Sequence, residues 1–568
     1  MNAARWTLRT TRPDDEESLR REFGMTPVLA RLLTARGISN PAQVADFLES
    51  KLSRQLRSPM LFRDMGAAAG RVAEALARGE RIGIFGDYDV DGISGSAILV
   101  SFFRALGHEP ALHIPHRVRD GYGLSDSGIR VLAEQGVKLL ITVDCGGSSH
   151  REIALARQSG IDVIVCDHHQ VSGTPLPAYA NLNPIEADAG FPFSGLCGAG
   201  VAFYLTMGVR MRLREQGGVE LPDLRRWLDL VTLGTIADIV PMVEENRVLV
   251  RHGLREIATS TRPGMIALKT VGGVSSVSTG TVGFRLAPRL NAGGRLAEAS
   301  KGVELLTTSD PERARQLAEE LDQENRARQA IEEEILEDAL HRLESDPETS
   351  SRRSIVLASS DWHPGVIGIV ASRLVERYYR PVALIALNSE TGLGRGSCRG
   401  IAGVHLYQAL ERCKAVLEGF GGHRMAAGLS IRSDAVPRLA DEFEQAVCAM
   451  TTAQDFVPKV DVDAEIAFDD IDDRLLEDLD RLEPYGPGNS EPTFLARGAT
   501  ILSRRIVGES HLKLYLRQGS RPFSAMAFRM AKAPIEQGDQ IDILTVPERD
   551  DYNGGIRLRI KHLRKTQS

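Results

Sequence analysis

Residues 81–92 read RIGIFGDYDVDG, and this stretch decides the fold of the region around it. Its first five residues form an apolar, β-rich run, and carboxylates follow at once. Two later runs, residues 139–143 (LLITV) and 161–165 (IDVIV), are also followed by Asp or His. Between about residues 80 and 240 such runs alternate with helical segments, which is typical of a mostly parallel sheet covered by helices. Because open α/β sheets keep their sites at the carboxyl ends of the strands, we expect these polar residues to meet at one edge.

The first polar string contains three carboxylates at alternate positions, Asp87, Asp89 and Asp91. Like charges this close repel one another unless a cation neutralises them, and hard divalent metals prefer oxygen ligands. A solvated acidic turn or a helix N-cap is the open alternative for this string alone. A calcium loop is disfavoured because the glutamate that closes such a loop is missing and a strand precedes the string.

Three further polar strings are candidates for the same site. Asp144 begins the string DCGG, and Asp167, His168 and His169 follow the third apolar run. Adjacent histidines are often structural, but after a buried strand and an orienting aspartate they suit metal ligation. Asp238 stands among apolar residues in GTIADIVP, where a carboxylate needs a partner. A dinuclear Mn²⁺ or Mg²⁺ site explains all four strings together.

A long charged segment separates the first region from two others. From residue 311 to about 348, leucine and isoleucine recur at helical spacing among charged residues, which predicts an amphipathic connecting helix. A glycine-rich α/β block follows from about residue 354 to 450 and contains GFGGHRMAAG at 419–428. After residue 456, alternating strands separated by turn residues predict a small β-barrel.

The composition excludes several classes of protein. The 568 residues, 42% hydrophobic and 26% charged, are too many for one core and predict roughly three or four domains without extensive disorder. The net charge of −7 argues against a uniformly basic coat, so any polyanion needs a local basic patch. Six scattered cysteines without a C-x-x-C pair, and no apolar run long enough to span a membrane, predict a cytoplasmic protein with reduced thiols and no membrane association.

In their order along the chain, these strings resemble the DHH phosphoesterase superfamily, and GFGGHRMAAG resembles the glycine-rich motif of the DHHA1 domain. Over its whole length the chain is similar to the RecJ family within that superfamily, exonucleases that degrade single-stranded DNA from the 5′ end. Gly95 and Gly147 depart from the family pattern but touch no expected ligand. The likeness includes RGI (36–38), DGYGL (120–124), LCGAG (196–200), GFR (283–285), PRLNA (288–292) and WHPG (362–365).

The resemblance implies an α/β fold class, with a mostly parallel sheet in a DHH domain, a long connecting helix, a DHHA1 α/β domain and a C-terminal OB-type β-barrel. We expect the N-terminal segment to pack on the catalytic core. The expected segments are the N-terminal segment (1–75), the DHH domain (76–305), the connecting helix (306–350), the DHHA1 substrate-binding domain (351–452) and the OB-fold nucleic-acid-binding domain (455–568).

The resemblance also implies roles for the site residues. Asp144 would bridge two Mn²⁺ or Mg²⁺ ions, and Asp87 would be either a further ligand or a neighbour of the ligands. His169 would face the scissile phosphate, and Asp167 would orient the histidines. The two ions would lower the pKa of a bridging water and stabilise the leaving oxygen, without a covalent intermediate. The ligands implied are Asp89, Asp91, Asp144, His168 and Asp238, and with His169 they form the expected catalytic set.

Candidate substrate-binding residues lie mostly in the later domains. Glycines near residue 420 let backbone N–H groups approach a phosphate, although a tight structural turn is the alternative. Arg289, Asn291 and Arg295 can reach either DNA or a domain interface. Residues 511–517 and 556–561 alternate between basic or aromatic side chains and apolar ones, so two basic strand faces can line a groove for a single strand; ordinary solvent-facing side chains are the alternative. The expected set is His169, Arg289, Arg373, Gly421, Gly422, His423, Arg424, Lys513 and Tyr515, with Arg395 a further candidate.

The expected function is that of an exonuclease that degrades single-stranded DNA from 5′ to 3′ in repair and recombination. A DHH–DHHA1 phosphodiesterase acting on nanoRNA, phosphoadenosine phosphate or a cyclic dinucleotide is an alternative, but such relatives need little beyond the two catalytic blocks. A non-catalytic DHH scaffold that binds single strands would be expected to lose ligands, whereas every expected ligand is present. Single-stranded DNA is the expected partner, a helicase and a single-strand-binding protein are further candidates, and a monomer is expected.

Overall fold

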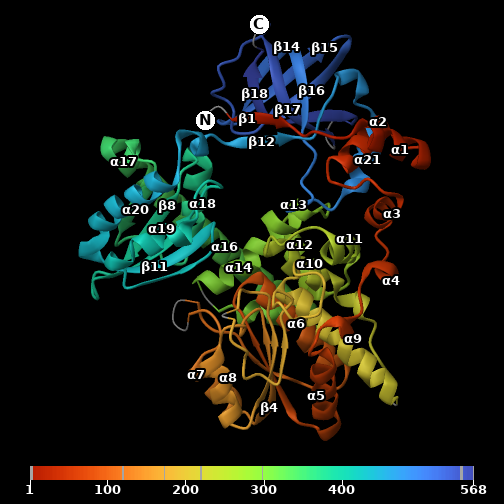
Figure 1. Ribbon diagram of the computed structural model, residues 1–568, viewed down its shortest axis with the longest axis vertical. Helices are drawn as coiled ribbons and strands as arrows, with labels where there is room; N and C mark the ends of the chain where they lie inside the picture. Colours follow the sequence, from red (N-terminus) through yellow and green to blue (C-terminus); the bar gives the residue numbers. More distant parts are fainter. Residues whose placement is uncertain are drawn as a thin grey trace. The chain divides into compact units, whose positions relative to one another are not determined.

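The structure, a computed structural model, describes residues 4–117, 121–171, 173–217, 220–296, 298–550 and 554–566. Its chain divides into two compact units (Figure 1). The first unit contains Leu56–Pro458, and the second combines Ala4–Gln55 with Lys459–Ser568. Two stretches that are far apart in the sequence thus fold together in the second unit.

A five-stranded parallel sheet lies at the centre of the first domain, which confirms the predicted fold class. Gly86 pairs with Val143, and Val143 pairs with Cys166, so the carboxyl ends of three neighbouring strands are level. The polar strings that follow these strands therefore begin at one edge of the sheet. The strand order is β3-β2-β4-β5-β6, with β2 Arg81–Gly86, β3 Ala111–His113, β4 Val137–Val143, β5 Asp162–Cys166 and β6 Ala180–Leu182.

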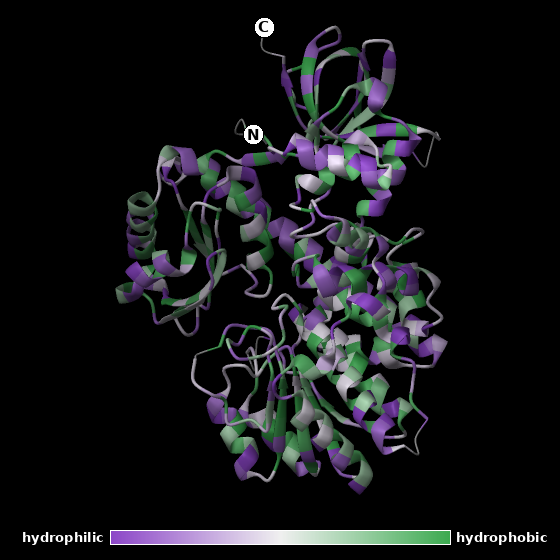
Figure 2. Ribbon diagram, turned by 45° about the vertical axis from the view of Figure 1, so that its right-hand side comes forward, coloured by the Kyte–Doolittle hydropathy of each residue, from purple (hydrophilic) through white to green (hydrophobic). Residues whose placement is uncertain are grey.

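Helices cover both faces of this sheet because its strands are apolar on both sides, as the hydropathy colouring of Figure 2 shows. In Figure 1, α7 and α8 lie on one face and α5 lies on the other. α6 and α9 are buried around most of their circumference and pack against each other. The helices of this domain are α5 Met65–Arg78, α6 Val90–Ala105, α7 Asp126–Glu134, α8 His150–Gln158, α9 Gly198–Gln216, α10 Leu228–Ala237, α11 Glu244–Thr259, α12 Pro263–Val271, α13 Thr279–Thr281, α14 Ala287–Leu296 and α15 Ser300–Thr307.

One helix of 35 residues, α16 Pro311–Ser345, joins the first domain to the second. It begins where the Asp310 side chain accepts hydrogen bonds from the backbone of Glu312 and Arg313, and it ends before Pro347. It packs against α12 and α14 of the first domain and against α18 Ile367–Tyr378 of the second. The charged, amphipathic pattern thus predicted a real helix.

The second domain contains a mixed five-stranded sheet in the order β10-β11-β9-β8-β7. β7 and β8 run parallel, and the other neighbours run antiparallel. β10, which contains three glycines, forms an exposed edge of this sheet. The elements are β7 Ile355–Ser359, α18, β8 Val382–Leu387, β9 Leu393–Arg399, α19 Leu406–Arg412, β10 Gly419–Gly422, β11 Ala426–Arg432 and α20 Val436–Met450.

The C-terminal part of the second unit is a closed five-stranded barrel, as predicted. The strands pair in the order β14-β15-β16-β18-β17, β17 pairs again with β14, and β16 and β18 run parallel. This is the strand order of an OB-type barrel. Leu512, Leu514 and Leu516 of β15 point into the core, which explains the alternation seen in the sequence. The strands are β14 Phe494–Val507, β15 His511–Gln518, β16 Arg521–Ala527, β17 Gln540–Arg549 and β18 Ile556–Lys565.

The N-terminal segment differs from the prediction that residues 1–75 pack on the catalytic core. Residues 4–55 belong to the barrel unit, whereas residues 56–75 belong to the first unit. Leu19, Leu29 and Val44 are buried in one core with Phe494 of the barrel and with Leu475. The short helices need an apolar partner, and the barrel unit supplies it. The elements are β1 Arg5–Leu8, which pairs with β12 Lys459–Val462, and α1 Pro13–Phe23, α2 Pro27–Thr34, α3 Pro41–Glu49 and α21 Asp473–Leu482.

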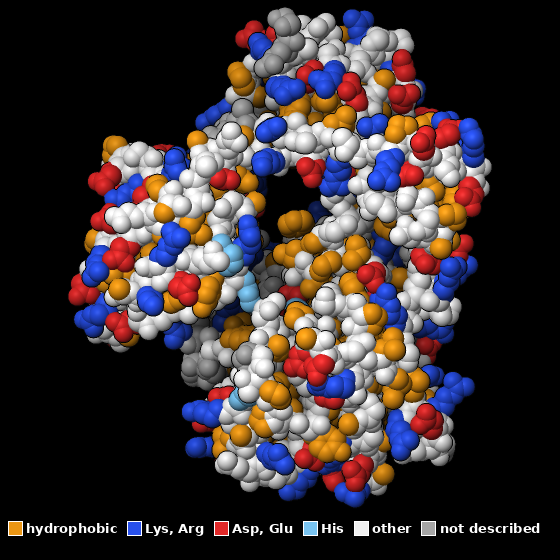
Figure 3. Space-filling model, viewed as in Figure 1, with side chains coloured by type: hydrophobic (Ala, Val, Ile, Leu, Met, Phe, Trp, Pro, Cys, Tyr) orange, Lys and Arg blue, Asp and Glu red, His pale blue; other side chains and the backbone are white. Residues whose placement is uncertain are grey.

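Charged side chains of both signs are mixed over the face seen in Figure 3, in keeping with the absence of a uniformly basic coat. All six cysteines are free thiols; Cys448 is exposed and the other five are buried. Among the described residues, no helix combines the length and the apolar character needed to cross a membrane.

Candidate metal centre

Asp87 and Asp89 lie in the turn between β2 and α6. Asp89 is the N-cap of α6, because its Oδ1 accepts hydrogen bonds from the backbone N–H groups of Asp91 and Gly92 at 2.8 and 3.2 Å. The helix-cap alternative is therefore right for one oxygen of Asp89. Asp87 is buried, and its Oδ1 has no hydrogen-bond partner among the described residues. Buried carboxylate oxygens are normally paired, so this one fits a site for a cation.

Asp91 is held by the first turn of α9. Its Oδ2 accepts a hydrogen bond from Gly198 N at 2.6 Å, and its Oδ1 accepts one from Ala199 N at 2.9 Å. The positive end of the helix dipole stabilises this carboxylate, whereas burial raises its pKa. The string LCGAG is part of the resemblance and has no role predicted from the sequence. In the structure its backbone fixes Asp91.

Asp144 lies at the centre of the acidic cluster. It follows β4 with a φ of 62°, a left-handed conformation that few residues other than glycine adopt. His168 Nε2 lies 3.1 Å from Asp144 Oδ1. A side chain at position 198 would place its Cβ 2.6 Å from Asp144 Cβ, so only glycine fits beside it. The chain therefore accepts both local strain and close backbone approach to place this carboxylate.

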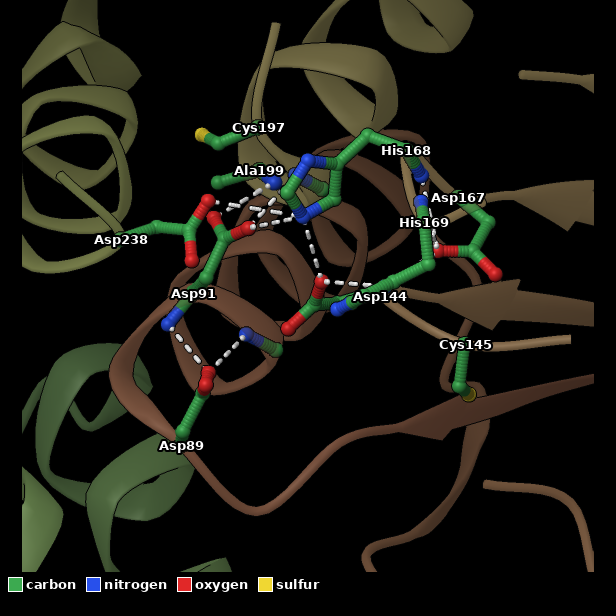
Figure 4. Close-up of polar contacts among 12 residues, drawn as sticks. Asp89, Asp91, Asp144, Cys145, Asp167, His168, His169, Cys197, Ala199 and Asp238 are labelled. Atoms are coloured by element: carbon green, nitrogen blue, oxygen red, sulfur yellow. Dashed lines mark hydrogen bonds and ion pairs between the residues drawn. The ribbon is translucent and has the colours of Figure 1, made fainter. Parts of the chain in front are cut away.

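His168 joins three carboxylates from three different elements of the fold. Its Nε2 lies 3.1 Å from Asp144, 3.5 Å from Asp238 Oδ2 and 3.7 Å from Asp91 Oδ2. Figure 4 shows these side chains pointing toward one another. Burial lowers the pKa of His168, which favours the neutral imidazole that a metal ligand must be.

Asp167 turns away from the cluster and orients the two histidines (Figure 4). Its Oδ1 accepts hydrogen bonds from the backbone N–H groups of His168 and His169 at 2.7 and 3.1 Å, and its Oδ2 accepts one from Gly147 N at 2.6 Å. Burial alone would raise its pKa, but the interactions with His169 and the backbone hold the pKa of Asp167 below its usual value. Asp167 is thus an ionised anchor for the motif.

His169 lies at the rim of the cluster, with 38% of its side chain exposed. Burial alone would lower its pKa, but Asp167, whose Oδ1 lies 2.8 Å from His169 Nδ1, raises it to about 9. The Tyr122 hydroxyl donates a hydrogen bond to the backbone oxygen of Asp144 at 3.1 Å and lies 2.9 Å from His169 Nδ1. Tyr122 has no role predicted from the sequence, although it stands in DGYGL, one of the strings that resemble the family.

The carboxylates of the cluster have raised pKa values because they are buried together. Burial and neighbouring carboxylates raise the pKa of Asp87 and Asp144, and they raise that of Asp238 to about 8. Ligand atoms within 4.8 Å of one another form three overlapping groups, in which Asp144 and His168 each occur twice. Oxygen and imidazole donors in this arrangement suit Mn²⁺ or Mg²⁺. The groups are Asp87, Asp89 and Asp144; Asp91, His168 and Asp238; and Asp144, His168 and His169.

Two arginines expected to bind substrate are paired within the chain. Arg289 Nε donates to Asp322 Oδ1 at 2.8 Å, so it joins α14 to α16. For Arg289 the interface alternative is therefore right, because its guanidinium is held by a carboxylate. Arg373 forms an ion pair with the buried Glu332 at 2.6 Å and stays half-exposed. Asn291 Oδ1 accepts a hydrogen bond from Val90 N at 3.2 Å, so Asn291 supports the acidic turn.

Arg295 is part of a concentration of positive charge beside the acidic turn. Burial and the nearby Arg117, Arg328 and Arg399 lower the pKa of Arg295 to about 10, while Asp89 acts in the opposite direction. Arg295 Nη1 donates to the backbone oxygen of Gly365 at 2.9 Å, which links the first domain to the second. Arginines gathered in one place favour an anion between them.

The glycine-rich string forms β10 and a hairpin to β11. Gly422 has a φ of 138°, and a Cβ there would lie 2.5 Å from Ala427 Cα, so the structural-turn alternative accounts for this glycine. Around Gly421 the space is open. His423 and Arg424 are exposed in the hairpin, and Arg424 donates to the backbone oxygen of Ala402 at 3.2 Å.

The two basic strand faces of the barrel differ from each other. On β15, Lys513 and Tyr515 are exposed, and Lys513 forms no ion pair with any described residue. On β18, Arg557 pairs with Glu548 at 2.7 Å, and Lys561 pairs with Glu491 at 3.1 Å. The basic side chains of β18 are therefore paired with neighbouring acids, so β15 is the better candidate for a binding face.

Comparison with known proteins gives matches along most of the chain. Family models match residues 81–235 (DHH family, N-terminal domain), 353–449 (DHHA1 domain) and 462–562 (RecJ OB domain). The single-stranded-DNA-specific exonuclease RecJ of Dickeya dadantii (strain 3937) is 38% identical over 560 residues, which cover 94% of this chain and 96% of that protein.

Two solved structures are similar over nearly the whole chain. The crystal structure of RecJ in complex with Mn²⁺ from Thermus thermophilus has a TM-score of 0.85 and 31% identity, and it covers 99% of this chain and 80% of that chain. The Mg²⁺ complex from the same organism has a TM-score of 0.79 and 30% identity, and it covers 99% of this chain and 79% of that chain.

Proposed function

The chain belongs to the RecJ family, and from this premise we propose that it is a metal-dependent exonuclease that hydrolyses single-stranded DNA from the 5′ end. The observation that carries the proposal is the convergence of five carboxylates and two imidazoles at one edge of the parallel sheet. The unpaired oxygen of Asp87 and the raised pKa values of the carboxylates support a need for cations. A non-catalytic scaffold would be expected to lose these ligands, and none is missing.

We assign the ligand groups to two divalent ions, Mn²⁺ or Mg²⁺. Asp87, Asp89 and Asp144 would hold one ion, and Asp91, His168 and Asp238 would hold the other. Asp144 lies close to both groups and is the candidate to bridge them. The bound ions would supply charge neutralisation at the phosphate and a lower pKa for the attacking water.

The chain's own residues complete the chemistry. Asp167 raises the pKa of His169 to about 9 and so favours the protonated imidazole, which can attract an oxygen of the scissile phosphate. Asp167 and Tyr122 fix the orientation of its imidazole. The arginines around Arg295 offer further positive charge to the backbone of the strand.

For substrate binding we retain most of the expected residues. Lys513 and Tyr515 offer a charge and an aromatic ring on one barrel strand, a combination that binds single strands without sequence preference. Arg289 is withdrawn because Asp322 holds it and its side chain is largely buried, whereas Arg373, although paired with Glu332, stays half-exposed. The barrel, which a phosphodiesterase of nanoRNA or cyclic dinucleotides does not need, favours a longer strand. The other residues retained are Arg373, Gly421, His423 and Arg424, whereas the turn accounts for Gly422.

We also propose a setting for this activity. An exonuclease of this kind would act in DNA repair and recombination in the cytoplasm, as a monomer, with a helicase and a single-strand-binding protein as candidate partners. The free state of all six cysteines suits a reducing compartment.

The direction of hydrolysis is tested with end-blocked strands. Single strands blocked at the 5′ end should resist the protein in Mn²⁺, whereas strands blocked at the 3′ end should be degraded, as followed by gel electrophoresis of internally labelled DNA. The variant Asp91→Asn, purified in the same way, controls for contaminating nucleases. Faster degradation of strands with a free 3′ end than of strands with a free 5′ end would refute the proposed polarity.

A further inference from the structure

Phe284 is the most exposed of the large hydrophobic residues that the structure describes, at 85%. It lies in η3 Val282–Leu286, a π-helical segment between α13 and α14. Such segments are rare and often mark functional sites. The string that contains this residue, GFR, helped to carry the family resemblance but received no role in the catalytic proposal.

The turn that carries Phe284 is held firmly in place. Val282 and Leu286, on either side of it, are fully buried, and Arg285 donates a hydrogen bond to the backbone oxygen of Gly273 at 2.8 Å. An exposed phenylalanine ring in a mobile loop can fold back onto the surface. Here the backbone is pinned on both sides, so the ring stays exposed to water, which is unfavourable unless a ligand covers it.

Ile239 is a second exposed apolar residue at the metal centre. It directly follows Asp238, is 71% exposed and has a φ of 59°, which is a rare conformation for a β-branched residue. The η3 segment packs against α10, and a Cβ at Gly283 would lie 3.5 Å from Ile236 Cγ2. The segment that carries Phe284 therefore packs against the end of α10 that Asp238 caps. We call Phe284 and Ile239 the apolar rim.

The surroundings of the apolar rim also favour an apolar ligand. In the space-filling view, hydrophobic side chains gather over the region of α12 and α13, and α13 packs against η3 (Figure 3). The ligands at the sheet edge are acidic and suit cations that hold a phosphate, whereas the apolar rim offers no charge. A nucleotide presents the same two chemistries side by side, a charged phosphate and a flat apolar base.

We infer that the apolar rim is a stacking platform for an unpaired nucleobase beside the phosphate that is hydrolysed. This inference rests on the proposed function and names a residue that positions its substrate. Stacking on an aromatic ring is indifferent to base identity because every base has a π face. A base inside a duplex already stacks on its neighbours and pairs with its complement, so the platform favours single strands.

The test combines variants of Phe284 with abasic nucleotides. Single strands carry one abasic site at successive positions from the 5′ end, and kcat/KM is measured in Mn²⁺. For the wild type, one position should reduce kcat/KM about 10-fold. Phe284→Ala should reduce kcat/KM on the intact strand by a similar factor. An abasic site at that position should then cause no further reduction. Phe284→Trp should restore both values.

A purely structural role for Phe284 predicts a different result. In that case Phe284→Ala would lower kcat/KM by the same factor on every strand, abasic or intact. That outcome would overturn the inference. An unchanged kcat/KM on all strands would also overturn it. Phe23→Ala, which removes an exposed phenylalanine from α1, is the matched control and should leave the abasic profile unchanged.

The same strands separate this inference from the proposed function. If the wild type hydrolyses no single strand, the proposed function fails. The platform is then tested by fluorescence anisotropy, in which the affinity for intact and abasic strands is compared between wild type and Phe284→Ala in Ca²⁺. Coupling between the ring and one base would support the platform, and equal losses of affinity on all strands would overturn it.

Discussion

Two groups of partly or fully buried charges in this protein behave in opposite ways. In the barrel, Arg559 pairs with Glu491 and Glu548 at 2.5 and 2.9 Å. Burial alone would raise the pKa of Glu491, but Arg559 and Lys561 lower it. At the edge of the parallel sheet, burial and neighbouring carboxylates raise the pKa of Asp87 and Asp144, and the imidazole of His168 lies 3.1 Å from Asp144 Oδ1.

The difference shows how a structural charge can be told from a functional one. The barrel acids find their counter-ions inside the chain, so the pairs hold strands together. The carboxylates of the sheet edge lack enough counter-ions, and the folded chain bears this cost because a ligand from outside completes the site. Residue type alone does not separate the two groups, since both contain the charged residues that a nuclease needs.

Removing the central carboxylate of the sheet edge should have the largest effect on activity. Asp144→Asn should reduce hydrolysis of single strands in Mn²⁺ by about three orders of magnitude, because Asp144 belongs to two ligand groups. The same variant should raise the melting temperature of the metal-free protein by a few degrees, since one of several like charges is gone. Activity assays and calorimetry in EDTA measure the two effects.

Asp126→Asn is the matched control for this substitution. Its carboxylate forms an exposed ion pair with Arg151 in the same domain, so neither activity nor melting temperature should change appreciably. Undiminished nuclease activity in Asp144→Asn would remove Asp144 from the metal site.

The acidic cluster should make the metal-free protein less stable as pH rises. The pKa of Asp238 is about 8 in the fold, and those of Asp87 and Asp144 are also raised. A carboxyl group with a raised pKa stabilises the fold fully below its unfolded value near 4, and this stability is lost as pH rises through the folded value. The metal-free protein should therefore lose stability from this cluster between about pH 5 and pH 8.

Mn²⁺ should oppose this loss because it takes the place of the protons. Its stabilisation should grow with pH and reach about 2.7 kcal/mol at a concentration 100 times Kd. Thermal melts in EDTA and in Mn²⁺ at several pH values measure the difference, and Asp144→Asn should reduce it. A shift by Mn²⁺ that is equal at pH 5 and pH 8 would contradict the idea that protons and metal compete for these carboxylates.

Breaking the barrel pairs should give the smallest effect, and on stability alone. Glu491→Gln removes one of the two carboxylates that pair with Arg559 and the carboxylate that pairs with Lys561, so we expect the barrel unit to lose about 1–2 kcal/mol in urea unfolding. In Glu465→Gln the lost partner, Arg497, is about half-exposed, so the loss should be no more than about 0.5 kcal/mol. Equal losses in the two variants would show that the Glu491 pairs contribute no more than a surface pair.

Much of the fold and of the site was predictable because the signals are local. An apolar run such as residues 139–143 followed by Asp144 indicates a strand and its polar end without reference to the rest of the chain. The parallel alignment of β2, β4 and β5 then brings together residues 87–91, 144 and 167–169. The positions of charged partners are not local, and here prediction failed. Arg289 meets Asp322 and Arg557 meets Glu548 only after helices and strands have packed.

The N-terminal segment shows the same limit. Apolar residues recur at helical spacing in α1 (Leu19 and Phe23) and in α2 (Leu29 and Leu33). This pattern predicts that one face of each helix is buried, but it does not identify the surface that covers that face. In the structure their partners are Phe494 and Leu475, more than 400 residues later in the chain. Residues 4–55 therefore pack in the barrel unit rather than on the catalytic core, as had been expected from the resemblance.

The sequence by itself determined the order of strands and helices, the residues at the carboxyl ends of the strands, and the chemistry of the ligands. Hydrophobic period and residue type encode these features within a few neighbouring positions. Tertiary structure alone decided which charges stay unpaired, that Asp89 caps a helix while Asp87 lacks a partner, and that Tyr122 reaches His169. Charge balance is a property of the packed state, because the low dielectric of the interior makes each carboxylate depend on the neighbours that folding brings to it.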